Sequence, residues 1–159
     1  IMSLQHELGL PNPILPPGHE ALLSIVMTAA TLTKEGDRLL RPFGITDSQF
    51  NVLMLLKYQT DAGEINQTRL GRMLLVNRSN VTGLIDRMEQ AGWVRRRADP
   101  IDRRVKMVAL TDEGNDLVSR AEKVYFHRME EVLGELPATS LAQLVRLLDR
   151  LRQRLRQVS

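Results

Sequence analysis

The residues best suited to a chemical task lie on one predicted helix in the middle of the chain. Its apolar residues recur at three- and four-residue steps, which place side chains on one face of an α-helix. They are Val81, Leu84, Ile85 and Met88. The other face carries side chains that can donate hydrogen bonds to phosphates and to base edges. They are Arg78, Ser79, Asn80, Thr82 and Arg87. The pattern predicts a helix that packs with one side and contacts a nucleic acid with the other.

A shorter helix must come immediately before this one. Asn66 and Asn77 are suited to cap the two helices, because the side-chain oxygen of asparagine accepts hydrogen bonds from the free amides of a first helical turn. The caps are 11 residues apart, so the first helix is short and the turn after it is tight. Thr68 and Arg69 fall in its first turn, where they can also contact a phosphate backbone. Gly92 is suited to end the second helix.

Two short strands joined by a charged turn are predicted after the second helix. The strands are residues 93–98 and 105–110, and the turn between them contains Asp102, Arg103 and Arg104. A helix-turn-helix followed by a basic hairpin is typical of a winged DNA-binding domain. The charged side chains of the turn are therefore candidate DNA contacts.

Basic residues are concentrated in this part of the chain. Residues 66–106 hold ten Lys and Arg against four Asp and Glu, a net charge of +6, whereas the rest of the chain has a net charge of −3. A basic segment on an acidic body is the electrostatic pattern of a polyanion-binding site. A solvated charged surface is the alternative, and the neighbouring helix-turn-helix favours nucleic acid.

Composition limits the remaining possibilities. Of the 159 residues, 43% are hydrophobic and 4% aromatic, enough for one domain with an aliphatic core, which favours helices. The absence of Cys excludes disulfides, thiolate metal sites and a thiol redox switch. No apolar run reaches the ~20 residues that a membrane span needs, and no signal-peptide pattern is present. We therefore expect no membrane contact and a cytoplasmic location.

An enzymatic function finds little support in the sequence. The three histidines, His6, His19 and His127, are scattered. The glycines form no phosphate-binding loop, and no cluster of Ser, His and Asp suggests a nucleophile. We expect no catalytic residue, no cofactor and no metal site.

Helices are also predicted before the DNA-binding segment. Four prolines, the first at position 11, predict an extended arm over residues 1–17. A helix should follow over residues 18–41. Thr46 and Gln49 form a capping box that starts another helix, over residues 47–58.

Two more helices are predicted after the wing. Thr111 is placed to cap a long one that ends near residue 136, and the last covers residues 140–157. The last helix has a longer apolar stripe than a DNA-binding unit of this size can cover. The stripe is Leu141, Leu144, Val145, Leu148, Leu151, Leu155 and Val158. A two-fold dimer would cover it and place two recognition helices one DNA turn apart, ~34–36 Å. Packing within one subunit is the alternative.

The expected fold class is mainly α with a small β wing: a winged helix-turn-helix domain plus a helical dimerisation domain. The arm is residues 1–17, and the DNA-binding domain is residues 46–111. Residues 18–45 and 112–158 form the dimerisation region, so we expect a homodimer.

The DNA-binding segment resembles the MarR family of bacterial transcriptional regulators. Asp102 and Arg104 match the charged half of that family's wing signature. Leu110 and Thr111, which follow after five residues, match the rest. The stretch VTGLIDRMEQAGWV is similar to the family's recognition helix and first wing strand. Gly83 departs from the pattern, since a basic or larger polar side chain is common there, and it removes one potential base contact.

The resemblance implies a dimeric transcriptional regulator, most often a repressor, that binds a palindromic operator in double-stranded DNA. It implies that Arg104 enters the minor groove, where A·T-rich DNA concentrates negative potential. Asp102 can pair with an arginine and hold the loop. The resemblance also implies release from DNA by a small aromatic or phenolic effector. Candidate effector contacts are His19, Tyr58, Trp93, Tyr125 and His127.

Two other functions stay open on the sequence alone. An architectural protein would use the helix and wing for electrostatic, sequence-independent DNA binding. A helical protein-interaction module would show no salt-dependent DNA binding. A preference for a palindromic site over random DNA at fixed salt separates a specific regulator from an architectural protein.

Overall fold

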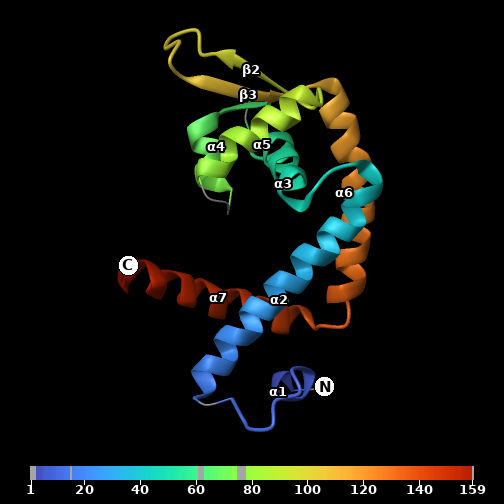
Figure 1. The fold of residues 1–159 in the computed structure, drawn as a ribbon, viewed down its shortest axis with the longest axis vertical. Helices are drawn as coiled ribbons and strands as arrows, with labels where there is room; N and C mark the ends of the chain where they lie inside the picture. Colours follow the sequence, from blue (N-terminus) through green and yellow to red (C-terminus); the bar gives the residue numbers. More distant parts are fainter. Residues whose placement is uncertain (1–2, 15, 61–62, 75–77, 159) are drawn as a thin grey trace. The chain divides into compact units, whose positions relative to one another are not determined.

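The protein is mainly helical, with one small antiparallel sheet. A computed structural model describes residues 3–14, 16–60, 63–74 and 78–158. Their elements are α1 (Leu4–Glu7), α2 (Pro17–Leu40), the 3₁₀ turn η1 (Arg41–Phe43), α3 (Asp47–Tyr58), β1 (Glu64–Asn66), α4 (Gln67–Met73), α5 (Arg78–Gln90), β2 (Val94–Ala98), β3 (Lys106–Leu110), α6 (Asp112–Leu133) and α7 (Ala138–Val158) (Figure 1). This architecture confirms the predicted fold class.

Packing divides the chain into two compact units. The first unit is Ile1–Ala121 and contains the three strands, and the second is Glu122–Ser159. Helix α6 begins in the first unit and ends in the second. The boundaries predicted at residues 46 and 111 separate a DNA-binding domain from a dimerisation region, not two packing units. They stay predictions.

Aliphatic side chains build the core of the first unit. The predicted stripe of α5 is buried: Ile85 and Met88 are 0% exposed, and Val81 is 4% exposed. Residues of α3, of the sheet and of the first turns of α6 are buried as well. They include Phe50, Val52, Leu53, Leu56, Val94, Val108, Leu117 and Val118. Because the core holds the apolar half of α5, its polar half faces solvent.

The helix caps predicted at Thr46 and Asn66 are confirmed. The Thr46 hydroxyl accepts from the Gln49 amide at 3.3 Å, and the Gln49 side chain accepts from the Thr46 amide at 2.9 Å. Asn66 Oδ1 accepts from the amides of Thr68 and Arg69, at 2.7 and 3.3 Å. These bonds satisfy amides that a first helical turn leaves without partners.

The wing belongs to a three-stranded antiparallel sheet with the order β1-β3-β2. Strands β2 and β3 form the predicted hairpin, each beginning one residue later than predicted. The sequence analysis predicts no strand where the structure has β1, in which Glu64 pairs with Ala109 and Asn66 with Met107. Strand β1 is short and its partner lies far along the chain, so no local pattern indicates it.

Helix α5 ends in a tight turn that leads directly into the wing. Gly92 has a φ of 78°, a conformation that costs glycine little and other residues more. The Gly92 amide donates to the Glu89 carbonyl, and the Trp93 amide donates to the Met88 carbonyl, both at 3.0 Å. These two bonds form a Schellman motif, as expected for a glycine that ends a helix.

Helix α6 starts against this same turn. The Thr111 hydroxyl accepts from the Gly114 amide at 3.0 Å, which confirms the predicted cap, and donates to the Gly92 carbonyl at 2.6 Å. A Cβ on Gly114 would lie only 2.0 Å from the Trp93 carbonyl oxygen. The first turn of α6 therefore packs directly on the backbone where the wing begins.

The N-terminal arm differs from the extended segment predicted over residues 1–17. Residues Leu4–Glu7 form one helical turn, α1, which precedes the first proline at position 11. Proline disfavours helix at its own position and just before it, so it leaves these earlier residues unrestricted. Helix α2 starts at Pro17. Proline lacks a backbone N–H, but the N–H of the first helical position has no partner within the helix, so proline is tolerated there.

The end of α6 and the whole of α7 form the second unit. The predicted last helix is confirmed and begins two residues earlier than predicted. None of the described residues of α7 is buried. Among the helices that the structure describes, none has the length and apolarity required to cross a membrane.

Two glycines provide a matched test of the α6 contact. We expect Gly114→Ala to lower the free energy of unfolding by about 1–3 kcal/mol, because the new methyl group would overlap the Trp93 carbonyl. Gly83→Ala, inside α5, should instead raise it by up to about 1 kcal/mol. The nearest atom to its new methyl group would be Arg87 Nη1, at an ordinary 3.6 Å. Chemical denaturation of both variants checks this, and a Gly114→Ala protein as stable as wild type would contradict it.

Candidate nucleic-acid interface

A groove lies between α4, α5 and the wing. Its volume is about 300 Å³, and its walls carry hydroxyl, amide and cationic side chains. Its lining includes Asn66, Gln67, Thr68, Thr82, Arg104 and Lys106. The Gln67 amide donates to the Thr82 hydroxyl at 3.3 Å. Three of the predicted DNA contacts, Thr68, Thr82 and Arg104, therefore line one groove although they are separated in the sequence.

The polar half of α5 is exposed where the structure describes it. Asn80, Thr82 and Arg87 have exposed side chains. Outside the described residues lie the predicted cap Asn77 and the side chains of Arg78 and Ser79. The base contacts predicted for α5 stay predictions.

Carboxylates hold the backbone of the wing loop. Asp99 Oδ1 accepts from the amides of Asp102 and Ile101, at 3.1 and 2.8 Å. These bonds favour the charged carboxylate and hold the pKa of Asp99 below its usual value. Asp102 Oδ1 accepts from the Arg104 amide at 3.0 Å. Sequence reasoning missed Asp99, which stands before Pro100 at the start of the turn.

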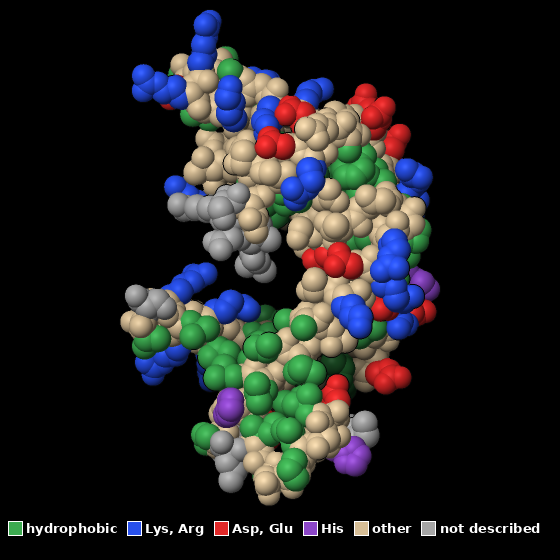
Figure 2. Space-filling model, in the orientation of Figure 1, with side chains coloured by type: hydrophobic (Ala, Val, Ile, Leu, Met, Phe, Trp, Pro, Cys, Tyr) green, Lys and Arg blue, Asp and Glu red, His purple; other side chains and the backbone are tan. Residues whose placement is uncertain are grey.

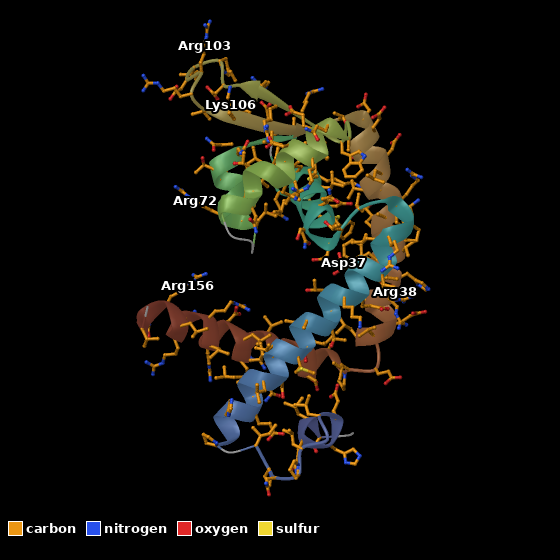
Figure 3. All side chains as sticks on the ribbon, in the orientation of Figure 1. Asp37, Arg38, Arg72, Arg103, Lys106 and Arg156 are labelled. Carbon is orange, nitrogen blue, oxygen red and sulfur yellow. The ribbon has the colours of Figure 1, made fainter. Side chains whose placement is uncertain are left out.

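Asp102 holds the loop differently from the prediction. Among the described residues it has no arginine side chain as a partner, and the backbone amide of Arg104 takes that place. The side chains of Arg103 and Arg104 are exposed, and Figure 3 shows Arg103 pointing away from the loop into solvent. A loop fixed through its backbone can present both guanidinium groups to a ligand.

Two of the described basic residues of this segment are paired with carboxylates of the same chain. Arg97 forms a bidentate ion pair with Glu64, in which Nε donates to Oε2 at 2.7 Å and Nη2 donates to Oε1. The Arg97 hydrogen bonds hold the pKa of Glu64 below its usual value. Arg96 is half-buried and pairs with Asp86 and Glu89. Counting charges along the sequence therefore overestimates the number of cations that can meet DNA.

Besides the paired Arg97, seven basic residues of this segment have exposed side chains among the residues that the structure describes. They are Arg69, Arg72, Arg87, Arg95, Arg103, Arg104 and Lys106. Arg104 and Lys106 line the groove itself, whereas the other five lie outside its lining. Figure 2 shows Lys and Arg side chains projecting around the wing, and Figure 3 shows Arg72 pointing outward from α4.

The predicted effector contacts do not gather in this groove. His19, Tyr58 and His127 are exposed, whereas Trp93 and Tyr125 are half-buried. Lys57 Nζ lies 5.1 Å from the centre of the Tyr58 ring, and Tyr125 packs edge-on against its neighbour Phe126. None of the five lines the groove. Their role in effector binding stays a prediction.

A helix-turn-helix whose second helix runs into an antiparallel β wing defines a winged helix-turn-helix DNA-binding protein. The chain belongs to the MarR family, whose model matches residues 45–106. It is a DNA-binding transcriptional regulator, as the resemblance implied, and not an enzyme, as the lack of catalytic motifs predicted.

Curated relatives and solved structures extend over most of the chain. The transcriptional activatory protein BadR of Rhodopseudomonas palustris is 34% identical over 79% of this chain and 74% of its own length. The transcriptional repressor MprA of Escherichia coli is 27% identical over 80% of this chain and 72% of its own. A crystal structure of a mutant MarR from E. coli, complexed with operator DNA, is 26% identical. It covers 94% of this chain and 99% of its own, with a TM-score of 0.74.

We expect Arg104→Ala to weaken DNA binding without loss of folding, because Arg104 is exposed and its loop is held by other groups. The slope of log affinity against log salt should fall by about 1 for each protomer, as expected when one phosphate contact is removed. The weakening should be largest at sites with A·T-rich flanks. Fluorescence anisotropy over a range of salt concentrations measures the slope.

Arg38→Ala is the matched control, since this arginine is exposed on α2 and already paired with Glu35. It should bind as wild type does. Asn80→Ala should instead alter the preferred bases inside a half-site, by about 1–3 kcal/mol for each base contact removed. An Arg104→Ala protein with wild-type affinity would refute the wing assignment.

Proposed function

We propose that the protein is a homodimeric regulator that recognises a palindromic operator, represses transcription from it, and is released by a small aromatic or phenolic effector. The supporting observation is the groove that joins Thr68, Thr82 and Arg104 beside the exposed half of α5. Side chains that can meet base edges and phosphates together are suited to sequence-specific binding. Such an operator would place the protein in the bacterial cytoplasm.

Exposed apolar surface on α7 supports the dimer. Between 48% and 82% of each of five apolar side chains is exposed in the single chain. They are Leu144, Val145, Leu147, Leu155 and Val158. Six apolar residues also follow a seven-residue repeat, the spacing of helices that pack side by side. They are Leu141, Leu144, Leu148, Leu151, Leu155 and Val158. A second copy would cover this surface.

Helix α2 supports the dimer as well. Its side chains Leu22, Val26 and Leu32 are 49%, 64% and 44% exposed. Figure 2 shows hydrophobic side chains gathered over this helix. Apolar patches of this kind on a soluble chain commonly mark protein–protein contacts.

The names of two relatives describe opposite signs of regulation. The name of MprA favours repression, and that of BadR favours activation. Repression needs only that the dimer occupy DNA where polymerase must bind. A reporter driven by a bound promoter should therefore rise when the gene for this protein is deleted, and a fall would assign activation instead.

The central experiment is selection and sequencing of DNA bound by the purified protein. We expect a palindromic site, bound at least about 10³-fold more tightly than random DNA at the same salt concentration. If about 6–10 phosphates are neutralised, affinity should fall roughly 10³–10⁵-fold between 50 and 200 mM salt. Equal affinity for the palindrome and random DNA would favour an architectural protein. The same assay, titrated with aromatic carboxylates and phenols, tests effector release.

Leu148→Glu tests the dimer. A carboxylate at the apolar seam of α7 would be costly to bury, so the variant should sediment as a monomer and lose operator binding. Gln153→Glu is the control, because it adds the same charge on the side of α7 away from the seam. An intact Leu148→Glu dimer in sedimentation velocity would count against α7 as the interface.

A further inference from the structure

Three consecutive arginines on β2 have different surroundings. Side chains alternate between the two faces of a strand, so Arg95 and Arg97 share one face and Arg96 points to the other. Arg95 is exposed, and Arg97 pairs with Glu64 of β1. Arg96 instead meets α5, the recognition helix. The sequence alone gives no reason to distinguish the three arginines, whereas the structure gives each of them different partners.

Arg96 binds three successive positions along α5. Its Nη2 lies 2.5 Å from Asp86 Oδ1 and 3.3 Å from the Thr82 carbonyl, and its Nη1 lies 3.3 Å from Glu89 Oε2. Its backbone amide also donates to Glu89 Oε1 at 2.8 Å. The acceptors are spaced by four and three residues, and therefore lie along one side of the helix.

The burial of these groups indicates a structural contact. The Arg96 side chain is 20% exposed, less than those of its partners Asp86 (45%) and Glu89 (39%). Its Nε is buried and has no hydrogen-bond partner among the described residues. Both terminal nitrogens already point at acceptors, so this guanidinium has little left to offer a phosphate.

We infer that Arg96 is a positioning residue: it fixes the angle between the recognition helix and the wing, and it does not neutralise DNA. The inference rests on the proposed function, since it deepens how that site recognises an operator. Arg96 holds the carbonyl of Thr82, a residue that lines the same groove as Arg104. Without this link, the helix and the wing would no longer present their DNA-binding side chains in one fixed geometry.

The alternative, a phosphate contact by Arg96, makes the opposite prediction for Asp86→Asn. If Arg96 binds phosphate, removing the carboxylate frees the arginine and removes a negative charge, so DNA binding should tighten. If Arg96 is a positioning residue, the variant loses its shortest link to α5. Operator affinity should then fall by at least about tenfold, the scale of a missing charge-assisted hydrogen bond. Affinity for random DNA and the salt slope should stay unchanged, because every phosphate contact is retained.

Arg96→Lys is the second variant. Lysine keeps the positive charge, but its compact ammonium group lacks the planar fork of donors with which the guanidinium spans these acceptors. We expect it to lose operator preference as Asp86→Asn does, while keeping wild-type affinity for random DNA. Arg95→Lys is the matched control at the adjacent, exposed position, and it should behave as wild type. Wild-type operator binding by Arg96→Lys, tighter or unchanged operator binding by Asp86→Asn, or an equal loss of preference in Arg95→Lys would overturn the inference.

A measurement without DNA separates this inference from the proposed function. Trp93 is the only tryptophan in the chain and lies between α5 and β2. Its emission maximum should shift in Asp86→Asn and Arg96→Lys, but not in Arg95→Lys, with circular dichroism unchanged. A wild-type protein without operator preference would refute the proposed function, even if these shifts occurred. Unshifted emission would refute the positioning role whatever the wild-type protein binds. If Arg96→Lys does not fold, Asp86→Asn alone decides, since its side chain is half exposed.

Discussion

The fixed contact between the start of α6 and the end of α5 is the constraint on which the DNA-binding unit depends. The Thr111 hydroxyl joins the Gly92 carbonyl to the Gly114 amide, and no side chain separates Gly114 from the Trp93 backbone. Strand β2 begins just after this point and β3 ends just before it. The base of the wing is therefore set by backbone contacts, which leave little freedom for adjustment.

The far part of the wing is held differently, by charged side chains. Arg97 joins β2 to Glu64 of β1, across the central strand β3, and Arg96 joins β2 to α5. Both links are partly exposed, so solvent weakens each of them relative to a fully buried pair. The wing thus combines a base set by backbone contacts with side-chain links that hold its strands against β1 and α5. The link through Arg96 connects the wing directly to the recognition helix.

Local patterns predicted most of the fold, and long-range pairings account for what they missed. Caps such as Thr46 and Asn66, and the stripe of α5, depend on residues within one or two helical turns, so the sequence shows them directly. Strand β1 and the partners of Arg96 and Arg97 depend on chain segments that meet only after folding. For the same reason the charge count overstates the basic surface of this segment, because it includes Arg96 and Arg97, which pair with carboxylates of the same chain. It also treated the remaining chain as uniformly acidic, whereas α7 carries five arginines and one aspartate.

Around Gly83, a local feature of the recognition helix and the long-range contact made by Arg96 act on the same turn. Glycine inside a helix costs about 1 kcal/mol relative to alanine, and Gly83 stands inside α5. The acceptors that Arg96 holds, at Thr82 and Asp86, lie on either side of it in sequence. A link across a flexible turn restores part of the rigidity that the glycine removes. It acts from the wing side of the helix, so it leaves the exposed side open to DNA. Gly83 leaves α5 with one side chain fewer that could contact a base. On the role inferred for Arg96, the wing compensates by holding the remaining side chains of α5 in a fixed geometry.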